Sequence, residues 1–196
     1  RDGSLLASLD RTVTSGGARA LAERISRPLR DPAAINQALD AVGWFLERRG
    51  LRRDLRDGLR ASADVARAVS RLALGRGGPR DLAAVRSGLN SAQALAGLFV
   101  SERDPLNGPP ARIIDCLDRL ALTPDTAALL AQLTDGLVDE PAHLARDGGF
   151  VTSGHRPELD EARRLRDDSR RVVADLEARA VAESGVPFKV RHNAVL

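Results

Sequence analysis

The side chains that most often carry out chemistry in enzymes are few in this sequence of 196 residues and lie far apart. The only lysine, Lys189, stands between Phe188 and Val190, whereas a phosphate-binding P-loop needs a lysine followed by serine or threonine after a glycine-rich loop. None of the three histidines begins a His-x-x-x-His pair, the helical spacing that binds zinc. The sequence therefore predicts neither a P-loop for ATP nor a zinc hydrolase.

A catalytic triad would require residues from distant parts of the chain to meet. Ser70, His143 and Asp147 have suitable chemical types, but no Gly-x-Ser-x-Gly motif marks a nucleophile. We expect each histidine to lie on the surface or in a loop, and we predict that the chain is not itself an enzyme.

Cys116 is the only cysteine, so no intrachain disulfide can form. A zinc site built on thiolates would lack its other sulfur ligands. Because Ile113, Ile114 and Leu117 surround Cys116 in the sequence, we expect a small buried hydrophobe rather than a reactive thiol. The sequence predicts no catalytic residue, no metal site and no bound cofactor.

Arginine dominates the charge of the chain, whose formal net charge is +3. Residues 46–86 hold eleven arginines against five acidic residues, a local excess of six positive charges. Such a band can bind phosphates, an acidic domain or only water. Because aromatic residues for base stacking make up only 3% of the chain, water or a neighbouring domain is favoured.

Helices must position these side chains, because apolar residues recur at three- and four-residue steps almost throughout. Residues with N-terminal capping chemistry precede several of the periodic segments, and one shorter segment from Val65 ends at Gly75. The start signals are Thr14, Asp31-Pro32, Gly78-Pro79 and Thr123-Pro124. We expect an all-α chain whose residues 1–155 form an irregular multi-helix core.

Residues 157–184 differ, because apolar residues form one narrow seam without an internal proline or glycine. At 1.5 Å per residue such a helix would span about 42 Å. Seven basic and eight acidic residues surround the seam in residues 156–184, which is typical of a protruding strut paired with a second helix. We expect this partner to lie in sequence outside the chain.

The last residues, 186–196, alternate apolar with basic or polar side chains, which predicts a short C-terminal strand that needs a partner. We therefore expect a second domain over residues 156–196, truncated within its β-part. The chain contains no methionine, so we expect a piece of a longer polypeptide. No long apolar run or signal peptide is present, and we expect a cytoplasmic location without a membrane partner.

Four blocks of sequence resemble, in the right order, the core (lever) domain of the bacterial MutS mismatch-repair family, and the last runs toward that family's clamp domain. They are 9–14 with 17–19, then 27–29, then 70–76 with 79–82, and finally 146–149, Gly154, 158–161, Lys189-Val190 and Asn193. One departure is His155-Arg156, where the family usually has an aromatic residue followed by an acidic or amide residue.

This resemblance implies a helical hub and a lever that supports a DNA clamp and transmits conformational change from an absent ATPase domain. ATP and Mg²⁺ would bind to the full-length protein, which would also contain the mismatch-reading and connector domains. The resemblance further implies that the full-length protein forms a homodimer and binds a MutL partner. It would act in the bacterial cytoplasm, associated with the nucleoid. Contacts of this chain with double-stranded DNA would be weak and made to the backbone. The candidates for these contacts are Lys189, Arg191, His192 and Asn193.

A different class of function remains open at this stage. The chain could be a helical protein–protein interaction scaffold, with acidic and basic faces and no role at DNA. Salt-sensitive affinity for a duplex would favour the DNA-clamping module, and a stable protein partner without such affinity would favour the scaffold.

Overall fold

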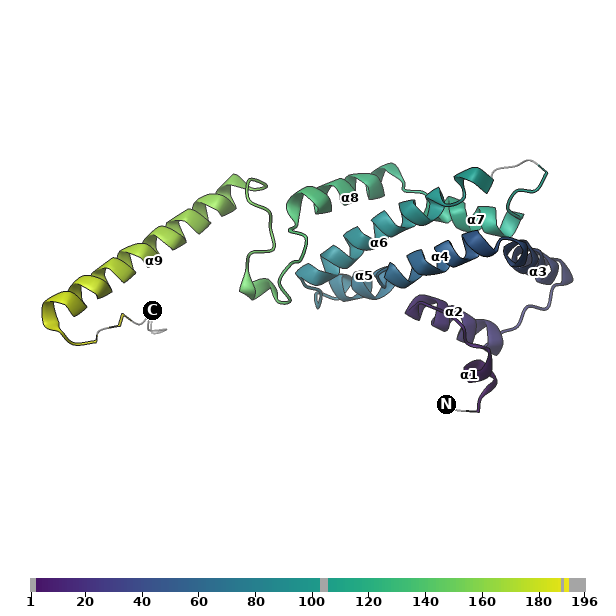
Figure 1. Ribbon diagram of the computed structural model, residues 1–196, viewed down its shortest axis with the longest axis horizontal. Helices are drawn as coiled ribbons and strands as arrows, with labels where there is room; N and C mark the ends of the chain where they lie inside the picture. The colour runs from purple at the N-terminus through teal and green to yellow at the C-terminus, as the bar shows by residue number, and fades with distance from the viewer. Residues whose placement is uncertain (1–2, 103–105, 188, 191–196) are drawn as a thin grey trace. The chain divides into compact units, whose positions relative to one another are not determined.

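The computed structural model describes residues 3–102, 106–187 and 189–190, and nearly all regular structure in these ranges is helical (Figure 1). The predicted all-α class is confirmed. The one strand-type pairing in the described ranges is an antiparallel bridge between Leu137 and Val151. The chain divides into two compact units, unit 1 (residues 1–151) and unit 2 (residues 152–196).

Unit 1 consists of successive helices joined by short connections. Its described helices are α1 (Leu5–Leu9), α2 (Ser15–Ser26), α3 (Pro32–Glu47), α4 (Arg49–Ala61), α5 (Val65–Ala73), α6 (Pro79–Gly97), α7 (Ala111–Leu120) and α8 (Pro124–Gly136), with short 3₁₀ turns η1 (Val100–Glu102) and η2 (Ala145–Asp147).

Side chains before several helices satisfy the backbone N–H groups that a helix start leaves unpaired. The Thr14 hydroxyl accepts a hydrogen bond from α2, the Asp31 carboxylate accepts two from α3, and the Thr123 hydroxyl accepts one from α8. α6 begins at Pro79, and the chain leaves α5 through Gly75, whose φ is +66°. The helix starts predicted from these residues are confirmed.

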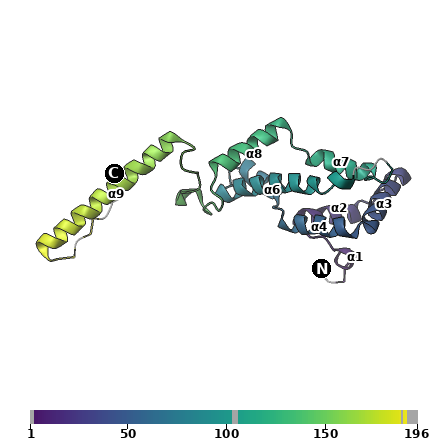
Figure 2. The ribbon, with the colours of Figure 1, turned by 45° about the horizontal axis from the view of Figure 1, so that its top comes forward.

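α6 is the helix around which unit 1 packs. It lies between α8 on one side and α4 and α5 on the other (Figures 1 and 2). Its first half joins α5 and α8 in the first hydrophobic cluster, and the two residues that follow it, Leu98 and Phe99, join α3 and α7 in the second. The buried members of the first are Ala68, Val85, Leu133 and Leu137. Those of the second are Trp44, Phe99 and Ile113.

The environment of α7 corrects one prediction. Ile113 is buried in the second cluster and Leu117 packs against it, whereas Ile114 is 45% exposed and Cys116 is exposed as well. The expectation that Cys116 is buried is wrong, because the core receives only the side of α7 that carries Ile113 and Leu117.

Unit 2 is built on α9 (Pro157–Ser184), which has the bounds predicted for the long helix. It has no buried residue, and Leu165, Val172 and Leu176 on its apolar stripe are 57%, 58% and 54% exposed. It ends at Gly185, whose φ of +65° suits a glycine C-cap. Among the described residues no helix is both long and apolar enough to cross a membrane.

The C-terminal strand stays a prediction. Residues 186, 187, 189 and 190 form no strand, and residues 188 and 191–196 lie outside the described ranges.

Candidate functional site

One of the four predicted DNA-backbone residues, Lys189, lies in the described part of the chain and is exposed. The next residue, Val190, donates its backbone N–H to the Glu177 carboxylate at 2.6 Å, which ties this segment to α9. Arg191, His192 and Asn193 lie outside the described residues. Their proposed contacts with DNA therefore remain predictions.

The residues considered for a catalytic triad have ordinary positions. The Ser70 hydroxyl donates to the carbonyl of Ala66 at 2.8 Å, as serines within helices commonly do. His143 and Asp147 are exposed. In the described ranges no group of three or more His, Cys, Asp or Glu side chains is placed to hold a metal ion.

Asp64, at the start of α5, fastens α2 to the junction between α4 and α5. Its carboxylate accepts two hydrogen bonds from the Arg19 guanidinium, at 3.0 and 3.1 Å, and one from the Ser15 hydroxyl at 2.7 Å. It also accepts a hydrogen bond from the backbone N–H of Arg67 as the N-cap of α5. The Arg19 and Ser15 hydrogen bonds hold the pKa of the Asp64 carboxyl well below its usual range.

Asp81 makes a similar connection between α5 and α6. It is only 7% exposed, pairs with Arg71 through a 2.9 Å bond from Nε, and accepts the backbone N–H of Gly78 at 3.0 Å. The Arg71 hydrogen bond, followed by that from Gly78, lowers the pKa of Asp81. We call the contacts of Asp64 with Arg19 and Ser15, and those of Asp81 with Arg71 and Gly78, the aspartate clasps.

A third contact of this type lies at the start of α9. The backbone N–H of Gly154 donates to the Asp160 carboxylate at 2.6 Å, and Arg163 donates to its other oxygen at 3.2 Å. Gly154 has φ +87°, a conformation that favours glycine. Asp160 thus ties the turn before α9 to the first turns of the helix, which has no side-chain cap of its own.

Much of the arginine band in residues 46–86 is used within unit 1. Arg86 donates to the carbonyls of Leu137, Val138 and Asp139 at 2.9 to 3.1 Å, at the C-terminal end of α8, where a helix carries unpaired carbonyls and partial negative charge. Arg48 pairs with Glu102 at 2.9 Å and lies 4.2 Å from the centre of the Trp44 ring. These arginines join helices, a use beyond the water or neighbouring domain expected from the sequence.

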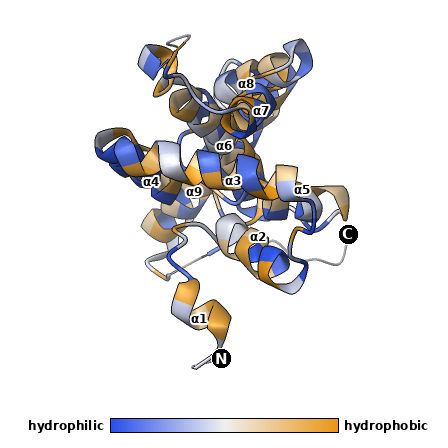
Figure 3. Ribbon diagram, turned by 90° about the vertical axis from the view of Figure 1, so that its right-hand side faces the viewer, coloured by the Kyte–Doolittle hydropathy of each residue, from blue (hydrophilic) through white to orange (hydrophobic). Residues whose placement is uncertain are grey.

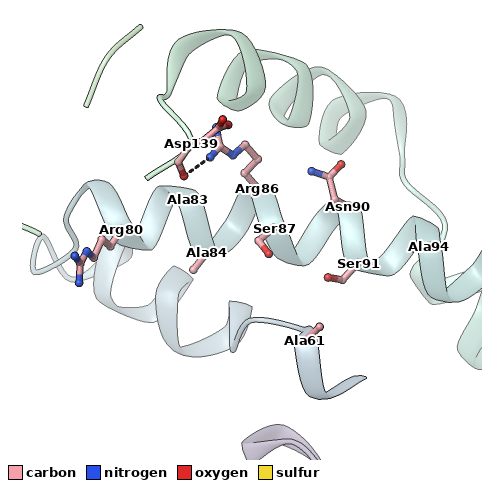
Figure 4. A pocket seen from close by; sticks show the side chains of 10 residues that line it. All are labelled: Ala61, Arg80, Ala83, Ala84, Arg86, Ser87, Asn90, Ser91, Ala94 and Asp139. Atoms are coloured by element: carbon pink, nitrogen blue, oxygen red, sulfur yellow. Dashed lines mark hydrogen bonds between the residues drawn. The ribbon is translucent and has the colours of Figure 1, made fainter. Parts of the chain in front are cut away.

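A hollow with a volume of about 750 Å³ runs along α6 (Figure 4). Small and polar side chains such as Ala83, Ser87, Ser91 and Ala94 line it. The charged residues in its lining are Arg80, Arg86 and Asp139, and Arg86 donates hydrogen bonds to three backbone carbonyls.

Comparison with known proteins shows the family to which the chain belongs. A sequence model described as MutS domain III matches residues 1–185. The chain belongs to the MutS family. Three residues of the aspartate clasps, Arg19, Arg71 and Asp81, lie in the sequence blocks that resemble this family.

Several relatives match the whole chain. The DNA mismatch repair protein MutS of Caulobacter sp. (strain K31) is 58% identical over 200 residues, that of Caulobacter vibrioides is 56% identical over 198, and that of Rhizobium meliloti is 49% identical over 199. Each match covers 100% of this chain but only 21% or 22% of the relative. The chain thus spans about a fifth of the length of these MutS proteins.

Proposed function

We propose that this chain is the core and lever module of a mismatch-repair protein of the MutS type. In this role residues 1–155 form the helical hub, and residues 156–196 form the ascending lever helix and the first strand of a DNA clamp. The observation that carries the proposal is α9, a 28-residue helix in a chain matched by MutS domain III.

Stiffness is the physical requirement for such a lever. α9 has no proline after its first residue and no glycine before its C-cap, so it lacks the residues at which helices most often kink. The Asp160 contact holds the turn from which the helix starts. Its exposed apolar stripe offers a second helix a surface to pack on, and a supported helix can carry displacement between distant sites.

Contacts with DNA in this proposal are made to phosphates. Lys189, Arg191, His192 and Asn193 would hold the backbone, which positions a protein but carries no direct sequence information. Mismatch recognition and ATP hydrolysis with Mg²⁺ would belong to other domains of the full-length protein. That protein would act in the bacterial cytoplasm, near the nucleoid, as a homodimer with a MutL partner.

Fluorescence anisotropy of this chain with matched and single-mismatch duplexes tests the DNA contacts. We expect weak binding that falls steeply with salt and is the same for both duplexes, with or without ATP. Lys189→Ala with Arg191→Ala should weaken it several-fold, whereas the control Arg27→Ala with Arg53→Ala, which removes two exposed charges of unit 1, should not.

Mismatch preference or an ATP response in this chain would contradict the division of roles. Equal weakening by both double variants would show that net charge, rather than the C-terminal residues, drives binding. Absence of any binding at low salt, together with a stable protein partner, would favour an interaction scaffold.

A further inference from the structure

A second hollow of unit 1 lies where the chain passes from α5 into α6, and its volume is about 450 Å³. Residues 76–78, between the two helices, line it together with residues 143–145, which follow α8. Three arginines and one aspartate give the lining a formal charge of +2 when its histidine is neutral. We call this site the arginine hollow, and its charged or titratable residues are Arg71, Arg76, Arg80, Asp81 and His143.

Most arginines in residues 46–86 have a partner within the described part of the chain. Nine of the eleven make a hydrogen bond or an ion pair there, as Arg71 does with Asp81. The side chains of Arg49 and Arg76 have no such partner among the described residues. Arg49 is exposed on α4, whose charged residues are blue in Figure 3, whereas Arg76 lies beside other cations in a hollow.

The other donors of the arginine hollow are only partly used. Arg80 makes one long hydrogen bond, of 3.5 Å, from Nε to the carbonyl of Pro141. Its terminal N–H groups therefore have no acceptor in the described ranges, although a guanidinium carries five N–H donors. The His143 ring and the backbone N–H of Gly77 also lack a hydrogen-bond partner among these residues. The hollow thus collects donors that the fold itself leaves available.

Two glycines hold the walls of the arginine hollow together. A Cβ at Gly78 would lie 3.3 Å from the carbonyl oxygen of His143, so the two segments that line the hollow touch at this point. A Cβ at Gly77 would lie 2.8 Å from Cα of Leu72, which places the segment tightly against the end of α5. The backbone that carries Arg76 is therefore fixed by its neighbours.

Asp81 does not neutralise the available donors, because its own hydrogen bonds are made elsewhere. It is only 7% exposed, and one carboxylate oxygen accepts from Arg71 while the other accepts from the N–H of Gly78. Arg71 and Asp81 therefore balance each other. The charges of Arg76 and Arg80 remain for a ligand.

The distribution of the donors favours a phosphate over a carboxylate. A carboxylate presents two oxygens in one plane, which a single guanidinium can bind. Here the donors come from three separate segments, and a phosphate presents oxygens in several directions with a charge that approaches −2. No Phe, Tyr or Trp stands among the described residues of the lining, so a nucleobase would find no ring to stack on.

We propose that the arginine hollow binds a phosphate group through Arg76, Arg80 and His143, while Arg71 stays paired with Asp81. A free phosphate ion and the phosphate of a nucleic-acid backbone present the same oxygens, and the experiment below separates these two sources. The site lies in unit 1 and is built without the C-terminal candidates. The inference therefore does not rest on the proposed function, which assigns DNA contacts to residues 189–193.

NMR spectroscopy of the ¹⁵N-labelled chain can test this site residue by residue. Sodium phosphate is added at constant pH, and sodium chloride keeps the ionic strength constant. The signals followed are the arginine Nε–H groups and the backbone N–H of Gly77, with Arg76→Lys and Arg80→Lys to identify the two arginine signals. We expect saturable shifts at these three positions and none at Arg49. Equal, unsaturable drift of all arginine signals would overturn the proposal.

Two double variants separate the arginine hollow from general charge. Arg76→Gln with Arg80→Gln should raise the Kd for phosphate, read from the Gly77 signal, at least about tenfold, because two charge-assisted donors are lost. Arg49→Gln with Arg53→Gln removes the same charge from exposed positions of α4 and should change the Kd less than about twofold at this ionic strength. Equal weakening by both variants would overturn the proposal.

Folding of the variants is checked by circular dichroism. The single variant Arg76→Gln removes a side chain without a partner among the described residues, so its melting temperature should equal that of the parent. It should still weaken phosphate binding several-fold. Unchanged binding in this variant would contradict the assignment of Arg76.

A short DNA duplex, added at the same ionic strength, distinguishes the sources of the phosphate. If free phosphate shifts the Arg76 and Arg80 signals and the duplex does not, the ligand is a small phosphate ion. If the duplex shifts them, and does so equally in Lys189→Ala with Arg191→Ala, the nucleic-acid backbone is a source. Absence of shifts with both would overturn the proposal, whatever the anisotropy of the C-terminal variant shows about the proposed function.

Discussion

Asp64 and Asp81 lie at the starts of α5 and α6, and each carboxylate binds an arginine of a preceding helix. Asp64 accepts hydrogen bonds from Arg19 and Ser15, and Asp81 accepts them from Arg71 and Gly78. In both cases the ionised carboxylate is the form that accepts these bonds. Folding therefore favours ionisation, and the stability of unit 1 becomes linked to pH.

Acid should weaken unit 1 through these two residues. Because the pKa of each carboxyl is lower in the folded chain than the value of about 3.9 in unfolded peptides, their contribution is complete above that value and is lost as pH falls below it. We expect the melting temperature, followed by circular dichroism, to start falling as the pH approaches about 4 and to continue falling at lower pH.

The variant Asp64→Asn with Asp81→Asn should melt at a lower temperature at pH 7 and show a smaller further decline in acid. Asp118→Asn, which neutralises an exposed carboxylate of α7, is the control for the change in net charge. A double variant with the full acid-dependent decline would show that the aspartate clasps are not linked to stability.

Helices α5 and α6 approach closely at Gly88. A Cβ at this position would lie 1.9 Å from Cγ2 of Val65, a β-branched side chain with little freedom to move. By contrast, a Cβ at Gly50 of α4 would meet nothing within 4 Å. The packing of α5 against α6 therefore requires glycine at position 88, whereas position 50 has room for a side chain.

Gly88→Ala should destabilise unit 1 by about 1–3 kcal/mol, because α5 and α6 must separate or Val65 must leave its position. Gly50→Ala should be neutral or stabilising by up to about 1 kcal/mol, since alanine favours the helix. Urea denaturation followed by circular dichroism measures both. If the two variants lose similar stability, the close approach of α5 and α6 is not what Gly88 provides.

Local signals account for several of the predicted helices, although α1, which Ser4 caps, was not predicted. α2, α3 and α8 begin after a side chain that accepts a backbone hydrogen bond, and each start was predicted. α4 and α7 were not predicted, and the residues before them, Arg48 and Pro110, make no such bond. α9 was predicted with its full bounds, because the helix depends on its own periodicity between Pro157 and Gly185.

The candidate site was less predictable, because its contacts are made across long distances in the sequence. Ser15 and Arg19 meet Asp64 across 49 and 45 residues, and no periodic pattern relates such positions. The exposure of Cys116 has the same origin, since the phase of α7 is set by Phe99 and Trp44 in the second cluster. The basic and polar residues near the C-terminus could be chosen as DNA-backbone candidates from their side-chain types, but their contacts with DNA stay predictions.

At the scale of the whole molecule, the described chain combines two small hydrophobic clusters with apolar stripes that remain exposed. α6 takes part in the first cluster of unit 1, and Leu98 and Phe99, which follow it directly, take part in the second, whereas α9 of unit 2 buries no residue. Large aliphatic residues of α3 and α9, such as Leu39 and Val172, are more than half exposed. The central claim is that α9 acts mechanically, by carrying displacement between the hub and a clamp.

The most direct test uses a full-length chimera in which this sequence replaces the matched segment of the Caulobacter sp. relative. It breaks α9 with Val172→Pro and compares this variant with Val172→Ala. Proline inside a helix costs about 3 kcal/mol or more, whereas alanine at this exposed position keeps the helix intact. We predict that Val172→Pro still binds mismatched DNA without ATP, but that ATP releases it from the DNA at least tenfold more slowly than the parent. Val172→Ala should respond to ATP as the parent does. A proline variant with the parent's ATP response would contradict the account, because a broken helix could not then be the element that transmits the change.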